Sequence, residues 1–88
     1  MNEELKAVAL KYEKTRDRAP KVVAKGKKKL AEKIIELAKE NNVEIYEDPD
    51  LAEMLYGLDF NEEIPEELYG AVAEILAYVY KMSKNKRF

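Results

Sequence analysis

Apolar and polar residues follow two different periods along this chain, and these periods divide it into six expected elements. Residues 7–12 (AVALKY) and 21–26 (KVVAKG) are short apolar runs that we expect to form strands. Residues 13–18 are a polar connection, and Pro20 lies just ahead of the second strand, where it need not donate to a ladder. Residues 43–48 (VEIYED) alternate apolar and polar positions, which predicts a third strand.

The sequence predicts three helices: residues 27–42 and 64–85 show apolar residues at helical spacing, and residues 48–57 carry residues typical of helix ends. Residues 27–42 have an apolar stripe that we expect to face the core, with Asn41 or Asn42 as the C-cap. The stripe consists of Leu30, Ile34, Leu37 and Ala38. Residues 48–57 form a short helix with Asp48 as N-cap, Pro49 in its first turn and Gly57 at its end.

The longest predicted helix covers residues 64–85 and begins around Pro65. Its expected buried face consists of Leu68, Val72, Ile75, Leu76 and Val79. Gly70 lies inside this helix, where glycine costs about 1 kcal/mol relative to alanine, and this cost suggests close packing at that position.

The order of these elements predicts a small α/β (α+β) fold. A strand at 21–26, a helix and a strand at 43–48 would form a βαβ unit with parallel strands. We therefore expect a mixed three-stranded sheet packed by about three helices. We expect residues 1–88 to form one domain, with 81–88 as a basic tail that does not need to be ordered.

Composition favours a globular chain outside the membrane. Apolar residues make up 47% and charged residues 39%. The longest nearly apolar run, 71–80, contains Glu74 and is shorter than the roughly 20 residues of a membrane span. Glu3 and Glu4 do not fit a signal peptide, and the absence of cysteine makes the cytoplasm the default compartment.

The residue types exclude most catalytic and metal chemistry. The chain has no cysteine and no histidine, so a nucleophile–histidine pair and the commonest metal ligand are both missing. The acids between 44 and 53 lack the spacing of a calcium loop, and KGKKKL (25–30) fails the P-loop pattern. We expect no cofactor, no metal and a binding function.

Charge is strongly segregated along the chain. Residues 1–33 carry a balance of +6, residues 34–80 of −12, and residues 81–88 of +4. A nucleic-acid-binding module using Lys21, Lys25 and 27–29 is therefore an alternative, which a salt-dependent shift of nucleic acid would identify. The acidic body counts against this alternative.

Four stretches of the sequence resemble a known family and so indicate which kind of binding module this chain is: AVALKY, APKVVAKG, PDLAEMLY and IPEELYGAVAEILAYVY. In this order they resemble the cytoplasmic C-terminal domain of the FlhB/YscU family, the specificity-switch proteins of flagellar and virulence type III export. The resemblance runs from about Asn2 to Tyr80 and implies an export module.

The resemblance also implies a cleavage motif, Asn-Pro-Thr-His, shortly before the AVALKY strand. Asn2 is the only match, because Glu3, Glu4 and Leu5 occupy the other three positions. We therefore expect no self-cleavage and no enzymatic activity. A residual autoprotease is a third possibility, which mass spectrometry would reject if the chain persists intact from Met1.

The chain looks like the family's cleavage product encoded directly, without the membrane half and the strand that precedes the cut. Its partners would then be membrane proteins of the export apparatus, including a full-length or truncated relative, and the hook-length control protein. A partner segment could pair with the sheet edge at Ala7, Val8, Ala9 and Leu10. The alternative is an edge protected by its flanking charges. We expect only indirect, peripheral attachment to the inner membrane.

The family domain is further associated with early, rod- and hook-type export substrates, which bind an exposed apolar patch. By motif, the patch in this sequence is Ala19 and Pro20 together with Ala73 and Leu76. The alternative is that Ala73 and Leu76 serve only helix packing, the commoner fate of apolar residues at this spacing.

Overall fold

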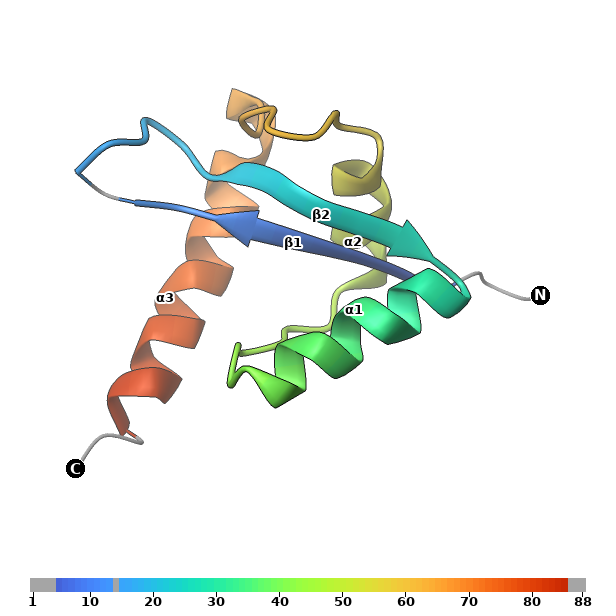
Figure 1. Cartoon of the computed structure of the whole chain (residues 1–88). Coiled ribbons are helices and arrows are strands. Elements are labelled where there is room, and N and C mark those ends of the chain that lie inside the picture. Colours follow the sequence, from blue (N-terminus) through green and yellow to red (C-terminus); the bar gives the residue numbers. More distant parts are fainter. Residues whose placement is uncertain (1–4, 14, 86–88) are drawn as a thin grey trace.

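The structure is a computed structural model that describes residues 5–13 and 15–85. The chain forms a two-stranded ribbon with three helices around it (Figure 1). The elements are β1 (Lys6–Lys11), β2 (Lys21–Lys27), α1 (Lys29–Glu40), α2 (Pro49–Tyr56), a 3₁₀ turn η1 (Glu66–Leu68) and α3 (Tyr69–Asn85). The predicted small α/β class with about three helices is confirmed. No helix within the described ranges combines the length and apolarity needed to cross a bilayer.

The sheet is an antiparallel ribbon in which Lys6 lies opposite Lys27 and Lys11 opposite Lys21. Its register shifts between Ala9 and Leu10, where β2 contributes one extra residue. Antiparallel pairing follows from the short connection at 12–20, since parallel strands need a much longer crossover.

The prediction of a third strand and a βαβ unit is wrong for the part of the chain that the structure describes. Residues 43–48 do not join the sheet, which has two strands. Val43 instead donates its amide to the Ala38 carbonyl (2.8 Å) and extends the end of α1. Val43 and Ile45 are 56% and 38% exposed. The alternating pattern makes a strand possible, but a strand also needs a neighbour for its backbone groups.

α1 is shorter than the predicted 27–42 helix and turned relative to the expected stripe. Lys28 has a φ of 58°, outside the helical region, so the helix begins at Lys29. Asn41 is the C-cap, as expected. Ala31 is fully buried, whereas Leu30 and Leu37 are 55% and 48% exposed, so the expected core-facing stripe is wrong at those two residues.

Small residues on the two strands beneath α1 explain how the helix is rotated. In the register of the ribbon, Ala7 lies opposite Gly26 and Ala9 opposite Ala24. A Cβ placed on Gly26 would lie 2.5 Å from Cγ of Leu30, which shows how closely α1 approaches β2. A helix can come this near only over small side chains.

α2 has the ends that the sequence indicates. Asp48 is the N-cap and accepts a hydrogen bond from the Leu51 amide (3.1 Å), Pro49 is the first residue, and Gly57 is the C-cap. Leu51 and Leu55 then face inward, one turn apart.

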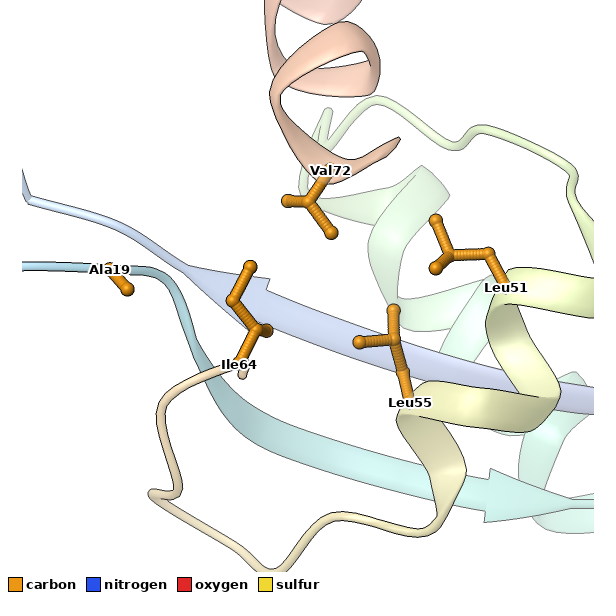
Figure 2. Close-up of a cluster of buried hydrophobic side chains, with 5 residues drawn as sticks. All are labelled: Ala19, Leu51, Leu55, Ile64 and Val72. Carbon is orange, nitrogen blue, oxygen red and sulfur yellow. The ribbon is translucent and has the colours of Figure 1, made fainter. Parts of the chain in front are cut away.

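The core joins α2 and α3 to the segment just ahead of β2 and to Ile64. Its buried side chains, shown in Figure 2, are Ala19, Leu51, Leu55, Ile64 and Val72. Val72 points from α3 toward Leu51, Leu55 and Ile64 (Figure 2). Val8, Leu10, Leu58, Leu68, Ile75 and Leu76 pack around this cluster.

The last helix starts later than predicted. Ile64 is a buried core residue ahead of it, Pro65 is extended, and the first turn is 3₁₀ from Glu66. The close packing expected at Gly70 is wrong, because an added Cβ there would meet nothing within 4 Å. α3 continues to Asn85, through the first part of the basic tail; Val79 and the side chains that follow lie outside what is described.

Candidate functional site

A pocket of about 290 Å³ lies between the start of β2 and the first turns of α3. Its lining brings together all four patch residues expected from the sequence: Ala19 and Pro20 from one segment, Ala73 and Leu76 from another. The expected exposure of this patch is wrong for Ala19 and Pro20, which are buried, and holds fully only for Ala73, since Leu76 is half-buried. The remaining lining residues are Tyr12, Arg18, Ile64, Tyr69 and Val72. More than 50 residues separate the two halves of the patch in sequence, so only the fold brings them together.

The turn before Ala19 is held by Asp17 and Glu13. The Glu13 amide donates to Oδ2 of Asp17 (2.9 Å), and the Glu13 carbonyl accepts from the Asp17 amide (2.7 Å). The hydrogen bond from the Glu13 amide lowers the pKa of the Asp17 carboxyl below its ordinary value. Lys21, whose Nζ lies 3.6 Å from Oδ1 of Asp17, lowers this pKa further. Two charged residues therefore fix the turn that leads into the pocket.

A second set of backbone bonds attaches residues 61–64 to the outer edge of β2. The Ile64 amide donates to the Pro20 carbonyl (3.0 Å). Val22 uses both of its backbone groups there: its amide donates to Glu62 (3.1 Å), and its carbonyl accepts from Asn61 (2.7 Å). These bonds hold Ile64 beside Pro20 and so form the floor of the pocket.

α3 contributes residues that differ in burial. Val72 is buried, Leu76 is half-buried and packs against the core, and Ala73 is exposed. Leu76 therefore packs against the core and also forms part of the pocket wall. Ala73 is an exposed residue of the pocket lining, and an exposed alanine contributes little to packing.

The sequence reasoning missed the rim of the pocket. Tyr12, Arg18 and Tyr69 all line the pocket and are exposed. Tyr69 lies one helical turn before Ala73, a spacing that could have revealed it. An apolar floor with tyrosines and an arginine at the rim suits an apolar side chain on an extended peptide, whose backbone the rim groups can hydrogen-bond.

A larger groove of about 700 Å³ runs along the other edge of β1. Ala7, Val8, Ala9 and Leu10, the edge expected to pair with a partner, all line it. The opposite walls come from α1, residues 43–48, α2 and α3. Val72 and Leu76 line both the groove and the pocket.

The backbone groups of Val8 and Leu10 face this groove. The Lys28 amide donates to the Leu5 carbonyl (2.8 Å), so alternate residues from Leu5 bond to β2 and Val8 points away from it. Leu10 lies opposite Val22, whose backbone groups bond outward to residues 61 and 62. The Leu10–Val22 pair is therefore not hydrogen-bonded, and Leu10 also points into the groove.

Two of the lysines that the alternative assigns to nucleic-acid binding, Lys21 and Lys25, contact other groups of the protein. The Lys25 ammonium donates to the carbonyls of Tyr56 (3.1 Å) and Leu58 (2.5 Å), and Lys21 lies beside Asp17. These contacts weaken the nucleic-acid alternative. Asn2, the residue that the resemblance aligns with the cleavage motif, lies outside the described residues.

Comparison with known proteins gives the same family for nearly the whole chain. The family described as FlhB HrpN YscU SpaS matches residues 1–79. An uncharacterized protein of Bacillus subtilis, YlqH, is 46% identical over 85 residues, covering 93% of this chain and 91% of the relative. The flagellar biosynthetic protein FlhB of Aquifex aeolicus is also 46% identical, over 92% of this chain. This chain spans only 23% of that FlhB.

Solved structures show the same fold. The cytoplasmic domain of FlhB from Shewanella putrefaciens matches with a TM-score of 0.90 and 42% identity, over 94% of this chain and 65% of that one. A mutated EscU/SpaS C-terminal domain matches with a TM-score of 0.84 and 28% identity, over 88% of this chain and 96% of that one.

Proposed function

The chain belongs to the FlhB HrpN YscU SpaS family of flagellar and type III protein export, and on this premise we propose that it is a non-enzymatic binding module of the export apparatus. It binds early export substrates and takes part in the switching of substrate specificity. Its place is the cytoplasmic side of the inner membrane, where it is held by membrane proteins of the apparatus.

The observation that supports substrate binding is the pocket formed by Ala19, Pro20, Ala73 and Leu76. Its walls are apolar, and its rim carries tyrosine hydroxyls and the Arg18 guanidinium. An unfolded export substrate presents short apolar motifs with free backbone groups, which match such a pocket.

The edge at Ala7, Val8, Ala9 and Leu10 provides the second part of the proposal. A partner in the apparatus, either a full-length or a truncated relative, or the hook-length control protein, docks there with an extended segment. Docking by strand pairing needs backbone groups that face outward, and those of Val8 and Leu10 do so.

The test uses a substitution that changes only the pocket. Ala73→Glu puts a carboxylate into its apolar wall, and we expect at least tenfold weaker binding of a labelled peptide from an early substrate, measured by fluorescence anisotropy. Ala71→Glu is the matched control, because Ala71 is exposed on the same helix and does not line the pocket. Equal binding by both variants would contradict the proposed site.

A further inference from the structure

Arg18 is the one charged residue that lines the pocket beside α3, within the part of the chain that the structure describes. The other lining residues are apolar side chains and two tyrosines. Arg18 is exposed, so its guanidinium is open to a molecule that enters the pocket. This group stays positively charged over the whole physiological pH range. The pocket therefore combines an apolar interior with a single positive charge at its rim.

Two cations close to Arg18 in the sequence already have carboxylate partners. Nε of Arg16 lies 3.0 Å from Oε1 of Glu13. Nζ of Lys21 lies 3.6 Å from Oδ1 of Asp17. Arg18 has no ion pair with any side chain that the structure describes. The two acids of this connection are thus paired with other cations, and Arg18 remains able to pair with a carboxylate that a bound molecule brings.

The backbone on both sides of Arg18 is fixed. Before it, Asp17 accepts the hydrogen bond from the Glu13 amide (2.9 Å) that closes the turn. After it, Ala19 is only 2% exposed and belongs to the core. A side chain that extends from an ordered backbone loses less conformational freedom on pairing with a ligand than one on a free loop. The position of Arg18 beside the pocket is therefore set before any peptide binds.

We propose that Arg18 makes the pocket selective for an extended peptide with a carboxylate two residues away from its apolar anchor. The anchor fills the pocket, and the guanidinium pairs with the carboxylate through two parallel N–H bonds, the geometry that arginine offers to carboxylates. The spacing follows from an extended backbone, where every second side chain points to the same side and lies about 7 Å further along. This inference rests on the role of the pocket in the proposed function and specifies the class of substrate segment: an aliphatic residue with an aspartate or glutamate nearby.

The size of the pocket favours one anchor side chain over a helix. Its volume of about 290 Å³ lies at the lower limit of cavities that hold small ligands. A bound helix would need a longer groove, with contacts at several successive turns. Ile64, Val72 and Leu76 make the interior aliphatic, which suits a leucine, isoleucine or valine anchor. Backbone carbonyls of an extended peptide can accept hydrogen bonds from the hydroxyls of Tyr12 and Tyr69.

Synthetic peptides test the proposal on the full chain. The probe is an acetylated and amidated nine-residue peptide of glycine and serine, with a central leucine and an aspartate two residues to either side of it. The two aspartates offer the charge in either direction of the bound peptide. NMR titration measures the affinity and also follows the Nε–H signal of Arg18. A matched peptide with asparagine in place of both aspartates should bind three- to tenfold more weakly, since an ion pair near the surface is partly screened by water.

Variants of the chain identify the charge that is responsible. Arg18→Gln should bind both peptides equally, with the affinity that the parent has for the asparagine peptide. Arg16→Gln is the matched control and should retain the preference, because Arg16 is exposed in the same connection but does not line the pocket. Arg18→Glu should reverse the preference, so that a peptide with lysines in place of the aspartates binds best. A merely structural role for Arg18 would not produce this reversal.

The outcomes separate this inference from the proposed function. Arg18 does not select a carboxylate if the parent binds the aspartate and asparagine peptides equally, or if Arg18→Gln keeps the preference. The same conclusion holds if Arg16→Gln loses the preference as fully as Arg18→Gln does. A peptide with serine in place of the leucine should bind at least tenfold more weakly than the probe. If it binds as well as the probe, the pocket does not hold an apolar anchor, and the proposed substrate binding at this pocket fails as well.

Discussion

The Nζ of Lys25 donates a hydrogen bond to the backbone carbonyl of Tyr56, the last residue of α2, over a distance of 3.1 Å. The same ammonium reaches the Leu58 carbonyl and lies 5.3 Å from the centre of the Tyr56 ring and 5.5 Å from that of Phe60. A cation at a helix C-terminus satisfies carbonyls that have no partner in the helix. Lys25 thus fixes the end of α2 to the sheet.

Lys25→Met keeps the aliphatic stem and removes the ammonium. We expect the free energy of unfolding to fall by about 2 kcal/mol, since two carbonyls lose a charged donor. Urea denaturation followed by circular dichroism measures the change. Lys33→Met, an exposed substitution on α1, is the control and should leave stability within about 0.5 kcal/mol. An equal effect of both substitutions would show that the Lys25 contacts add nothing.

Leu76 lines the pocket and packs against the core, so Leu76→Glu distinguishes its two roles. We expect the substitution to weaken substrate-peptide binding at least tenfold while the domain stays folded, because a half-buried side chain on α3 can turn its carboxylate toward water. Binding by anisotropy and thermal melting of the same sample measure both effects. A large fall in melting temperature would instead identify Leu76 as a core residue.

Two glycines should respond to alanine in opposite directions. Gly26→Ala places a Cβ against Leu30 and should cost about 1–3 kcal/mol, because α1 must shift. Gly70→Ala meets nothing within 4 Å and should stabilise α3 by about 0.5–1 kcal/mol. Each serves as the control for the other in one set of denaturation curves. Stabilisation by Gly26→Ala would contradict the close approach of α1 and β2.

Asp17 should make the turn before the pocket sensitive to acid. Its pKa is lowered in the folded protein, chiefly by the Glu13 amide, so its stabilising effect is complete above the unfolded value of about pH 4. The effect is lost as the pH falls through the lower, folded value. Asp17→Asn should therefore be less stable than the parent at pH 7, and the difference should shrink below pH 4. A difference independent of pH would rule out this carboxylate as the cause.

Local signals in the sequence were sufficient where the chain contacts itself within a few residues. Asp48, Pro49 and Gly57 predicted both ends of α2, because an N-cap bond spans three residues and needs no distant partner. The strands at 6–11 and 21–27 were predicted to within one residue at each end from their apolar runs, although their pairing with each other was not predicted. The family was also recognisable from short motifs.

Burial on α1 required the fold. The spacing of Leu30 and Leu37 shows that they share a face, but not that α1 presents Ala31 to the ribbon instead. That choice depends on the size of Gly26 and the alanines on neighbouring strands, which are distant in sequence. Tyr12 and Arg18 at the rim of the pocket were not predicted, because residues in a loop follow no regular spacing that would show which side chains lie together.

By itself, the sequence determined the family, the ends of α2 and the extents of the two strands, but not that these strands pair with each other. Only the tertiary structure decided that Ala19 and Pro20 meet Ala73 and Leu76 in one pocket, and that residues 43–48 stay outside the sheet. Side-chain period and caps are properties of neighbouring residues. Strand pairing and pocket formation depend instead on backbone groups and surfaces brought together from distant segments, and their outcome is set by which partners the folded chain can supply.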